Sequence, residues 1–200
     1  MINHKYKKRL LRLGVLLLLI AAALLVLNSP WYLRRMYPFP YREMIIQHSR
    51  ESGLDPLLVA AMIQKESGFD PGAVSKKGAI GLMQVMPDTG CWVAGKLGVN
   101  GYTPEMLTNP DFNLRVGCWY LRYLGGEYQG DWVRVLAAYN AGIGNVQQWM
   151  ANGTWTGTWE TRNAIPFIQT RTYLAEVAVK YSMYDRIYRC EVGGVPAVFP

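Results

Sequence analysis

Apolar positions recur along most of the chain at intervals of three and four residues, the spacing that gives one face of an α-helix. No run alternates convincingly between apolar and polar positions, so a large sheet is not expected. After residue 40, glycines and prolines divide the pattern into successive segments. These segments predict helices over residues 41–52, 57–67, 87–97, 109–124, 132–141, 143–150 and 166–188. The expected fold class is therefore mainly α, with little or no β-structure.

The N-terminal segment departs from this amphipathic pattern. Leu13–Leu27 is a run of fifteen residues without a charged or polar side chain, and it reaches eighteen from Leu10 if Arg12 snorkels. A membrane-spanning helix needs about 20 apolar residues, with ~17 as a lower limit. The small-x-small triplet that a cleavage site requires, at residues 21–23, lies inside the run. We interpret the segment as an uncleaved signal anchor; a cleaved signal and a buried core helix are the alternatives.

Positive charge is concentrated at the same end of the chain. The net charge is +7, but residues 1–42 contain eight basic and no acidic residues, whereas residues 43–200 contain thirteen basic and fourteen acidic residues. A nucleic-acid-binding domain would carry the basic excess itself, so no nucleic-acid partner is expected. Five basic residues precede the apolar run, which favours a cytoplasmic N-terminus and an exported domain.

These features predict four parts of the chain. Residues 1–9 form a basic cytoplasmic tail, 10–33 the transmembrane signal anchor, 34–42 a short tether that prolines make stiff, and 43–200 the exported domain. Half of all residues are apolar and only 18% are charged, which excludes wholesale disorder. We expect a single-pass protein of the cytoplasmic membrane.

Three cysteines lie in the part expected to be exported: Cys91, Cys118 and Cys190. An odd number cannot all pair, and their spacing fits no metal motif. Cys118 lies in an apolar helical segment, which favours a small buried thiol. A disulfide between Cys91 and Cys190 stays open as an alternative. The sequence contains no metal or cofactor motif, so we expect neither group.

Glu66 occupies an unusual place in the helix predicted over residues 57–67. It lies four residues after Met62 and three after Ile63, so it continues the apolar stripe of that helix. Burial and the negative end of the helix dipole both raise the pKa of a carboxyl group at such a position. A carboxyl that is protonated at neutral pH can act as a general acid. The pattern alone also allows a glutamate that turns out to solvent or pairs with a nearby base.

Two later segments combine apolar character with polar groups suited to a ligand. Residues 75–87 are interrupted by Gly78 and Gly81, and glycine lets a backbone approach a ligand closely. Gln84 places a donor and an acceptor among methionines, a common composition for a pocket. Tyr139 and Asn140 then place a phenol and an amide side by side near the end of a helix. Each segment alone is also explained by a packed turn.

The three segments together resemble a known family. In order, Glu66-Ser67, Gly81-Leu82-Met83-Gln84 and Ala138-Tyr139-Asn140-Ala141-Gly142 resemble the three signature motifs of the soluble lytic transglycosylases, family 1. Residues 165–173 are similar to the closing helix of that family, and the resemblance covers about residues 43–182.

This resemblance implies a fold and an activity. The fold would be a helical, goose-type lysozyme-like domain with a sugar cleft. Such enzymes cut the β-1,4 bond between N-acetylmuramic acid and N-acetylglucosamine in the glycan strands of peptidoglycan, and they leave a 1,6-anhydro end. The domain would then lie on the wall-facing side of the membrane.

The resemblance also implies roles for individual residues. Glu66 would be the single catalytic acid: it would protonate the leaving oxygen and then, as a base, take the proton of the C6 hydroxyl that attacks C1. The substrate's own acetamido group would stabilise the intermediate, as in other substrate-assisted glycosidases. Tyr139 would hydrogen-bond Glu66 and tune its proton, while Asn140 would hold the turn or contact the sugar.

The remaining candidates would bind substrate or support the cleft. Ser75 would bind an acetamido group or orient Glu66, Gln84 would hydrogen-bond the sugar or its peptide stem, and Met86 would line the cleft. Tyr173 could reach the cleft or be a core tyrosine. Many family members carry glutamate where this chain has Gln169, which suggests an altered preference for the peptide stem.

Two other functions remain as alternatives. The same cleft could act as a muramidase-type hydrolase, but hydrolysis needs a positioned water, often held by a second carboxylate, and the motifs offer none. A non-catalytic wall-binding scaffold would also suit a membrane tether, although the retention of Glu66 argues against it.

Overall fold

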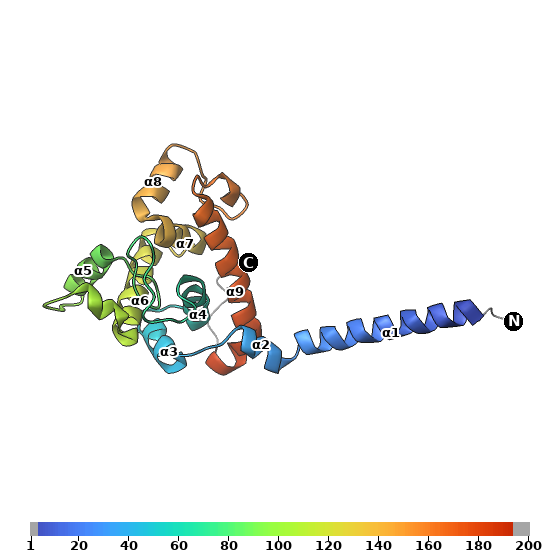
Figure 1. The fold of residues 1–200 in the computed structure, drawn as a ribbon. Coiled ribbons are helices and arrows are strands. Elements are labelled where there is room, and N and C mark those ends of the chain that lie inside the picture. Colours follow the sequence, from blue (N-terminus) through green and yellow to red (C-terminus); the bar gives the residue numbers. More distant parts are fainter. Residues whose placement is uncertain (1–3, 194–200) are drawn as a thin grey trace. The chain divides into compact units, whose positions relative to one another are not determined.

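The computed structural model describes residues 4–193, and the chain divides between Pro38 and Phe39 into two compact units (Figure 1). The first unit contains α1 (His4–Leu27) and α2 (Pro30–Met36). Ser29 caps α2 by accepting a hydrogen bond from the backbone N–H of Tyr32, and Pro30 occupies its first turn. The sequence did not predict α2, which includes part of the segment assigned to the tether.

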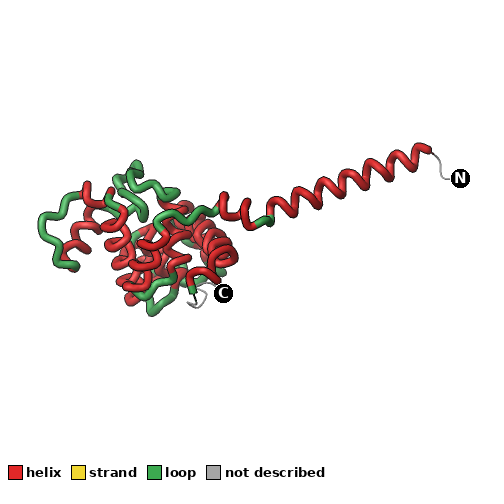
Figure 2. Tube along the Cα trace, turned by 90° about the horizontal axis from the view of Figure 1, so that it is seen from below, coloured by secondary structure: helices red, strands yellow, loops and turns green. Residues whose placement is uncertain are grey.

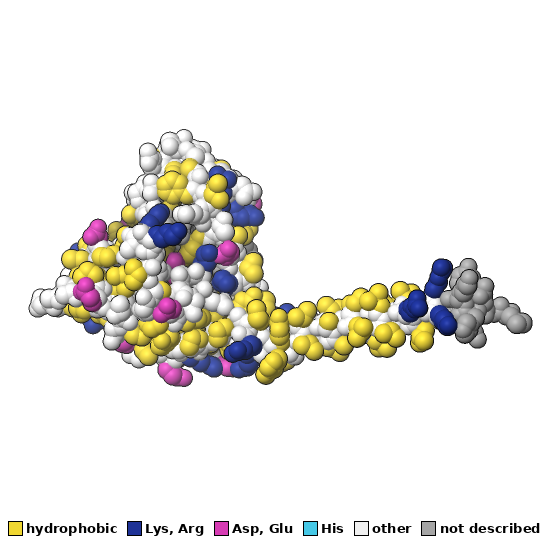
Figure 3. Space-filling model, in the orientation of Figure 1, with side chains coloured by type: hydrophobic (Ala, Val, Ile, Leu, Met, Phe, Trp, Pro, Cys, Tyr) yellow, Lys and Arg dark blue, Asp and Glu magenta, His cyan; other side chains and the backbone are white. Residues whose placement is uncertain are grey.

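The described leucines of α1 are exposed, with exposed fractions from 45% for Leu27 to 74% for Leu25. Hydrophobic side chains cover the visible face of this helix (Figure 3). By length and apolar character, no single helix among the described residues could cross a bilayer. Only the pair Leu11–Leu27 and Pro30–Met36, bent by 60°, meets that requirement together.

The second unit is helical throughout, with loops between the helices and no strand among residues 39–193 (Figure 2). Its elements are α3 (Arg42–Glu51), α4 (Pro56–Glu66), α5 (Pro87–Lys96), the 3-10 helix η1 (Pro104–Thr108), α6 (Pro110–Glu127), α7 (Trp132–Ala141), α8 (Ile143–Ala151), the 3-10 helix η2 (Arg162–Ala164) and α9 (Ile168–Val192). The mainly α prediction is confirmed, and the seven predicted helices of this unit are all present.

In two helices, an end differs from the prediction by more than one residue. The sequence predicted that α6 would stop at Gly125, but the helix continues through both glycines to Glu127 and ends where Gln129 adopts a left-handed φ of 54°. Glycine lowers helix propensity by about 1 kcal/mol, which is too little to end a helix that is packed elsewhere. α9 begins at Ile168 rather than Pro166 and extends to Val192.

α4 is the central helix of this unit. Its residues from Pro56 to Ile63 are all buried, and α9 packs along it more extensively than any other pair of helices. At its N-terminus, Asp55 accepts a hydrogen bond from the Leu57 N–H at 2.9 Å. The other oxygen of this carboxylate accepts bonds from the Tyr181 hydroxyl and from Arg189, both at 2.8 Å. A fully buried carboxylate thus fixes α4 to α9.

The loop between α4 and α5 has little regular structure but is tightly held. Two isolated bridges, Val74–Ile80 and Ile80–Val85, fold it back on itself. The buried Asn113 of α6 donates to the carbonyls of Ile80 and Leu107 and accepts from the Met83 N–H, at 2.8–2.9 Å. A Cβ at Gly81 would lie 2.3 Å from the Leu107 carbonyl oxygen, so only glycine fits there.

All three cysteines are free. Cys91 and Cys190 are exposed, so the disulfide considered from the sequence is not formed. Cys118 is buried, as predicted, and burial raises the pKa of its thiol to about 12.

Candidate active site

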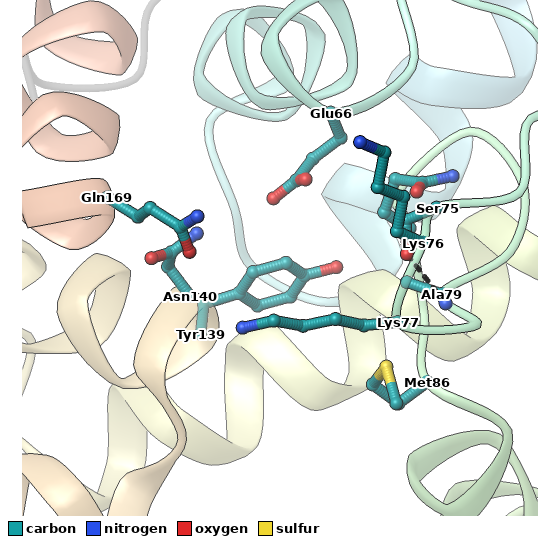
Figure 4. Close-up of a pocket in the computed structure, with 10 residues that line it drawn as sticks. Glu66, Ser75, Lys76, Lys77, Ala79, Met86, Tyr139, Asn140 and Gln169 are labelled. Atoms are coloured by element: carbon teal, nitrogen blue, oxygen red, sulfur yellow. Dashed lines mark hydrogen bonds between the residues drawn. The ribbon is translucent and has the colours of Figure 1, made fainter. Parts of the chain in front are cut away.

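Glu66, the last residue of α4, lies beside a cavity of about 420 Å³. Figure 4 shows its carboxyl group above the ring of Tyr139, with the side chains of α7, α9 and the loop before α5 around it. The residues that line this cavity are Glu66, Ser75, Lys76, Lys77, Ala79, Gln84, Met86, Tyr139, Asn140 and Gln169. A second cavity of about 450 Å³ shares Glu66 and adds Lys65, Ile168, Thr172 and Tyr173. The two cavities together form one cleft around the carboxyl group.

The surroundings of Glu66 raise its pKa from an ordinary 4.5 to about 7. Burial is the largest cause, because a desolvated carboxylate is less stable than the neutral acid. The nearby Tyr173 hydroxyl and the charge of Lys65 act in the opposite direction but do not cancel it. Lys65 forms its ion pair with Glu176 of α9 instead. The carboxyl is therefore half-protonated near neutral pH, as predicted from its place on the apolar stripe.

The hydroxyl groups of Ser67 and Ser75 both form hydrogen bonds with the backbone of the loop between α4 and α5. The Ser67 hydroxyl donates to the Leu82 carbonyl at 2.8 Å, which joins the end of α4 to the glycine-rich loop. The Ser75 oxygen accepts from the Ala79 N–H at 3.0 Å. Ser75 lines both cavities with Glu66, so its own hydroxyl proton is placed for a ligand.

Gln84 was predicted to hydrogen-bond the substrate, but its side-chain N–H groups bond its own loop. Its side-chain N–H groups donate to the carbonyls of Ala73 and Gly81, each at 3.0 Å, and its backbone has a left-handed φ of 49°. The donors are used to close the loop, so only the side-chain oxygen remains for a sugar or peptide.

The structure does not form the predicted hydrogen bond between Tyr139 and Glu66. The Tyr139 hydroxyl donates to the Met83 carbonyl at 2.7 Å, and a phenol has a single proton to give. Burial and the nearby Glu66 both raise the pKa of Tyr139, so it stays neutral. Tyr173 of α9 lies beside Glu66 instead: its buried hydroxyl makes no hydrogen bond to a described residue, and its presence lowers the pKa of Glu66.

Asn140 and Gln169 form the wall opposite the loop (Figure 4). The Asn140 side-chain oxygen accepts from the buried Thr170 hydroxyl at 2.8 Å, which fixes the end of α7 to the start of α9. Its side-chain N–H groups are left to face the cleft. Gln169 is exposed and borders both cavities, and Met86 lines the first cavity from the start of α5.

The sequence reasoning assigned no role to Lys76 and Lys77, which both line the cleft. A signal was present, because two adjacent cations stand between the first and second motifs. Among the described residues that line the first cavity, Glu66 is the only acid. No group of three or more His, Cys, Asp or Glu residues within the described chain could hold a metal ion.

Comparison with known proteins identifies the class to which this fold and site belong. The family model described as Transglycosylase SLT domain matches residues 43–161. The chain belongs to this family, which confirms the prediction of a transglycosylase SLT domain.

Particular relatives agree with this assignment. The soluble lytic murein transglycosylase of Escherichia coli K12 is 30% identical over 171 residues, which are 84% of this chain and 26% of that protein. A solved complex of the 70 kDa soluble lytic transglycosylase with bulgecin A has a TM-score of 0.71 at 29% identity, covering 78% of this chain and 25% of that one. An inactive glutamate-to-glutamine mutant of lytic transglycosylase Slt from Pseudomonas aeruginosa has a TM-score of 0.70 at 31% identity, covering 78% and 26%. The chain spans about a quarter of the length of these relatives.

Proposed function

We propose that this protein is a peptidoglycan lytic transglycosylase that cuts the bond between N-acetylmuramic acid and N-acetylglucosamine and leaves a 1,6-anhydro end. The observation that carries the proposal is a single carboxyl group, with a pKa of about 7, in a cleft whose other lining groups are neutral or cationic. The family membership and the lytic transglycosylase names of the relatives support it.

The chemistry needs one group that gives a proton and later takes one. Protonated Glu66 would donate to the glycosidic oxygen as the bond to C1 breaks, and the carboxylate would then accept the C6 hydroxyl proton as that oxygen attacks C1. A pKa of about 7 suits both steps, because the protonated acid and the carboxylate are then both well populated near neutral pH. Tyr173 is placed to stabilise the carboxylate between them.

A hydrolase remains the second candidate because it would use the same acid. An inverting glycosidase needs a second carboxylate, about 6.5–9.5 Å from the first, to activate water. Among the described residues that line the first cavity, Glu66 has no such partner. The geometry therefore favours internal attack by the C6 hydroxyl.

Product analysis of the full chain in detergent tests this proposal. Wild type and Glu66→Gln would digest purified peptidoglycan, and mass spectrometry would identify the soluble products. We expect wild-type products one water lighter than reducing muropeptides, and none from Glu66→Gln. Reducing-end products would assign a hydrolase, and retained binding without products from either protein would assign a scaffold.

We also propose that residues 10–33 anchor the protein in the cytoplasmic membrane, with the domain on the wall-facing side. The uninterrupted apolar run, the exposed leucines of α1 and the basic residues before the run support this arrangement. Carbonate extraction of membranes would leave the wild type in the pellet, and replacement of Leu17 and Leu18 by lysine would release it. A wild-type chain recovered in the soluble fraction would contradict the anchor.

A further inference from the structure

Two lysines project into the cleft from the turn between Ser75 and Ala79. Figure 4 shows the side chain of Lys77 extended past the ring of Tyr139 and that of Lys76 directed toward the region of Glu66. Both residues are exposed, and both line the first cavity. The wall that they face carries Asn140 and Gln169 (Figure 4).

The backbone that carries these lysines is fixed before any ligand arrives. The Ser75 N–H donates to the Ala79 carbonyl at 2.9 Å, and the Ser75 side chain accepts from the Ala79 N–H at 3.0 Å. Gly78 completes the turn with a φ of 85°, a left-handed value that favours glycine. Only the lysine side chains must be ordered on binding, which lowers the entropic cost of a contact.

The charges around the cleft are unbalanced. Neither Lys76 nor Lys77 forms an ion pair with a described residue, and the one acid in the first cavity, Glu66, is uncharged for half of the time near pH 7. The opposite wall contributes only amides. Residues 43–200 carry thirteen basic and fourteen acidic residues, so this cleft is cationic within a nearly neutral domain. Such a cleft attracts anionic ligands.

We propose that Lys76 and Lys77 bind free carboxylates of the peptide stem carried by the muramic acid residue in the cleft, and that the enzyme therefore prefers strands with unamidated, acidic stems. This inference rests on the proposed function, because it names a feature of that substrate. The neutral Gln169 fits the same preference, since a glutamate there would repel the stem.

The expected size of the preference follows from the exposure of both lysines. A solvent-exposed ion pair contributes about 0.2–1 kcal/mol and is screened by salt. Two such contacts together correspond to about a three- to tenfold difference in Kd. The difference should shrink as ionic strength rises, because the Debye length falls from about 10 Å at 0.1 M to about 3 Å at 1 M.

Binding to a non-cleaving protein tests the inference separately from catalysis. The probe is soluble, un-cross-linked glycan strands in three forms: with acidic stems, with the stem carboxylates amidated, and without peptide. Kd is measured for each with the full-length Glu66→Gln chain in detergent, and again after adding Lys76→Gln and Lys77→Gln together. A matched pair, Lys76→Arg and Lys77→Arg, keeps both charges, and Lys96→Gln removes an exposed lysine that does not line the cleft.

We expect the Glu66→Gln chain to bind acidic strands about three- to tenfold more tightly than amidated strands at low salt. The two glutamine substitutions should bring this ratio close to one, while the arginine pair and Lys96→Gln should retain it. Equal Kd values for acidic and amidated strands, or an unchanged ratio in the double glutamine variant, would overturn the inference. Absence of anhydro products from the wild type, with the ratio intact, would instead refute the proposed reaction and leave an acidic-stem binding site.

Discussion

The two ends of α4 each place a carboxyl group against α9, with opposite consequences. At the N-terminus, Asp55 is fully buried and accepts hydrogen bonds from Leu57, Tyr181 and Arg189. At the C-terminus, Glu66 is also desolvated, but Lys65, the lysine next to it in the sequence, forms its ion pair with Glu176. One carboxyl group is fixed by an ion pair and hydrogen bonds, and the other has a pKa of about 7.

The difference shows that burial alone does not set the pKa of a carboxyl group. A buried carboxylate with a cation and several donors is stabilised in its charged form, whereas the same group without them favours the neutral acid. The decisive feature is the set of partners that α9 offers at each end. Arg189 and Tyr181 of α9 bond Asp55, whereas no described residue of α9 forms an ion pair with Glu66, and the Tyr173 hydroxyl lowers its pKa only in part.

The largest expected effect on the proposed activity comes from removing the titratable group at the C-terminal end of α4. Glu66→Gln keeps the size of the side chain but cannot transfer a proton, so we expect kcat to fall by about 10²–10⁴-fold. Anhydro-product formation measured over time gives the rate, and circular dichroism checks that the fold is retained. A rate within tenfold of the wild type would assign the acid to another residue.

Breaking the structural end should reduce stability instead. Arg189→Met leaves Asp55 as an unpaired buried carboxylate, which should lower the free energy of unfolding by about 3–5 kcal/mol. Urea denaturation measures this value, with the exposed Arg122→Met as the control. Combining Arg189→Met with Asp55→Asn should cost less than the sum of the two single changes, because the pair is removed together. Strict additivity would show that Arg189 does not act through Asp55.

The C-terminal end of α4 should behave in the opposite way when stability is measured against pH. Folded Glu66 has a pKa of about 7 against an ordinary 4.5, so the folded protein holds this proton more tightly than the unfolded chain. Its stabilising contribution is complete below pH 4.5 and is lost as the pH rises through about 7. At pH 8, Glu66→Gln should therefore be more stable than the wild type by about 1–3 kcal/mol, with the gap closing toward pH 4. A constant difference across this range would contradict a raised pKa.

The smallest expected effect is a shift in the pH dependence of the rate when the Tyr173 hydroxyl beside Glu66 is removed. The wild-type rate should decline above about pH 7 as the acid form is lost. The Tyr173 hydroxyl lowers the pKa of Glu66, so Tyr173→Phe should move this alkaline limb to higher pH. Rate profiles of both proteins on soluble strands measure the shift. A profile that only falls in height would mean that Tyr173 has a packing role alone.

Local signals in the sequence predicted the helices and the place of Glu66. Asp55-Pro56 and Asp131 mark helix starts by capping, and both caps are formed. The spacing of Glu66 from Met62 and Ile63 predicted its desolvation, because helical geometry is fixed by neighbours in sequence. These features depend on residues within one or two turns.

Partners that lie far apart in the sequence could not be predicted in the same way. Tyr139 bonds Met83 rather than Glu66, and the donors of Gln84 turn back to its own loop. Both outcomes depend on how α6 and α7 dock beneath that loop, which no local pattern encodes. α2 was missed although Ser29-Pro30 is a capping signal, because the flanking prolines favoured an extended tether.

The hydrogen bonds of Asn113 restrict the motion of the loop between α4 and α5. Its side chain holds Ile80, Met83 and Leu107, and Met83 also packs against Gly117, where a Cβ would lie 2.3 Å from its sulfur. Local opening of the loop would have to break these bonds and undock Met83 at once. Amide hydrogens near Ile80 and Met83 should therefore exchange with solvent about as slowly as those of the central helices, although they belong to no regular helix or strand. The floor of the cleft should then open as rarely as the core of the domain.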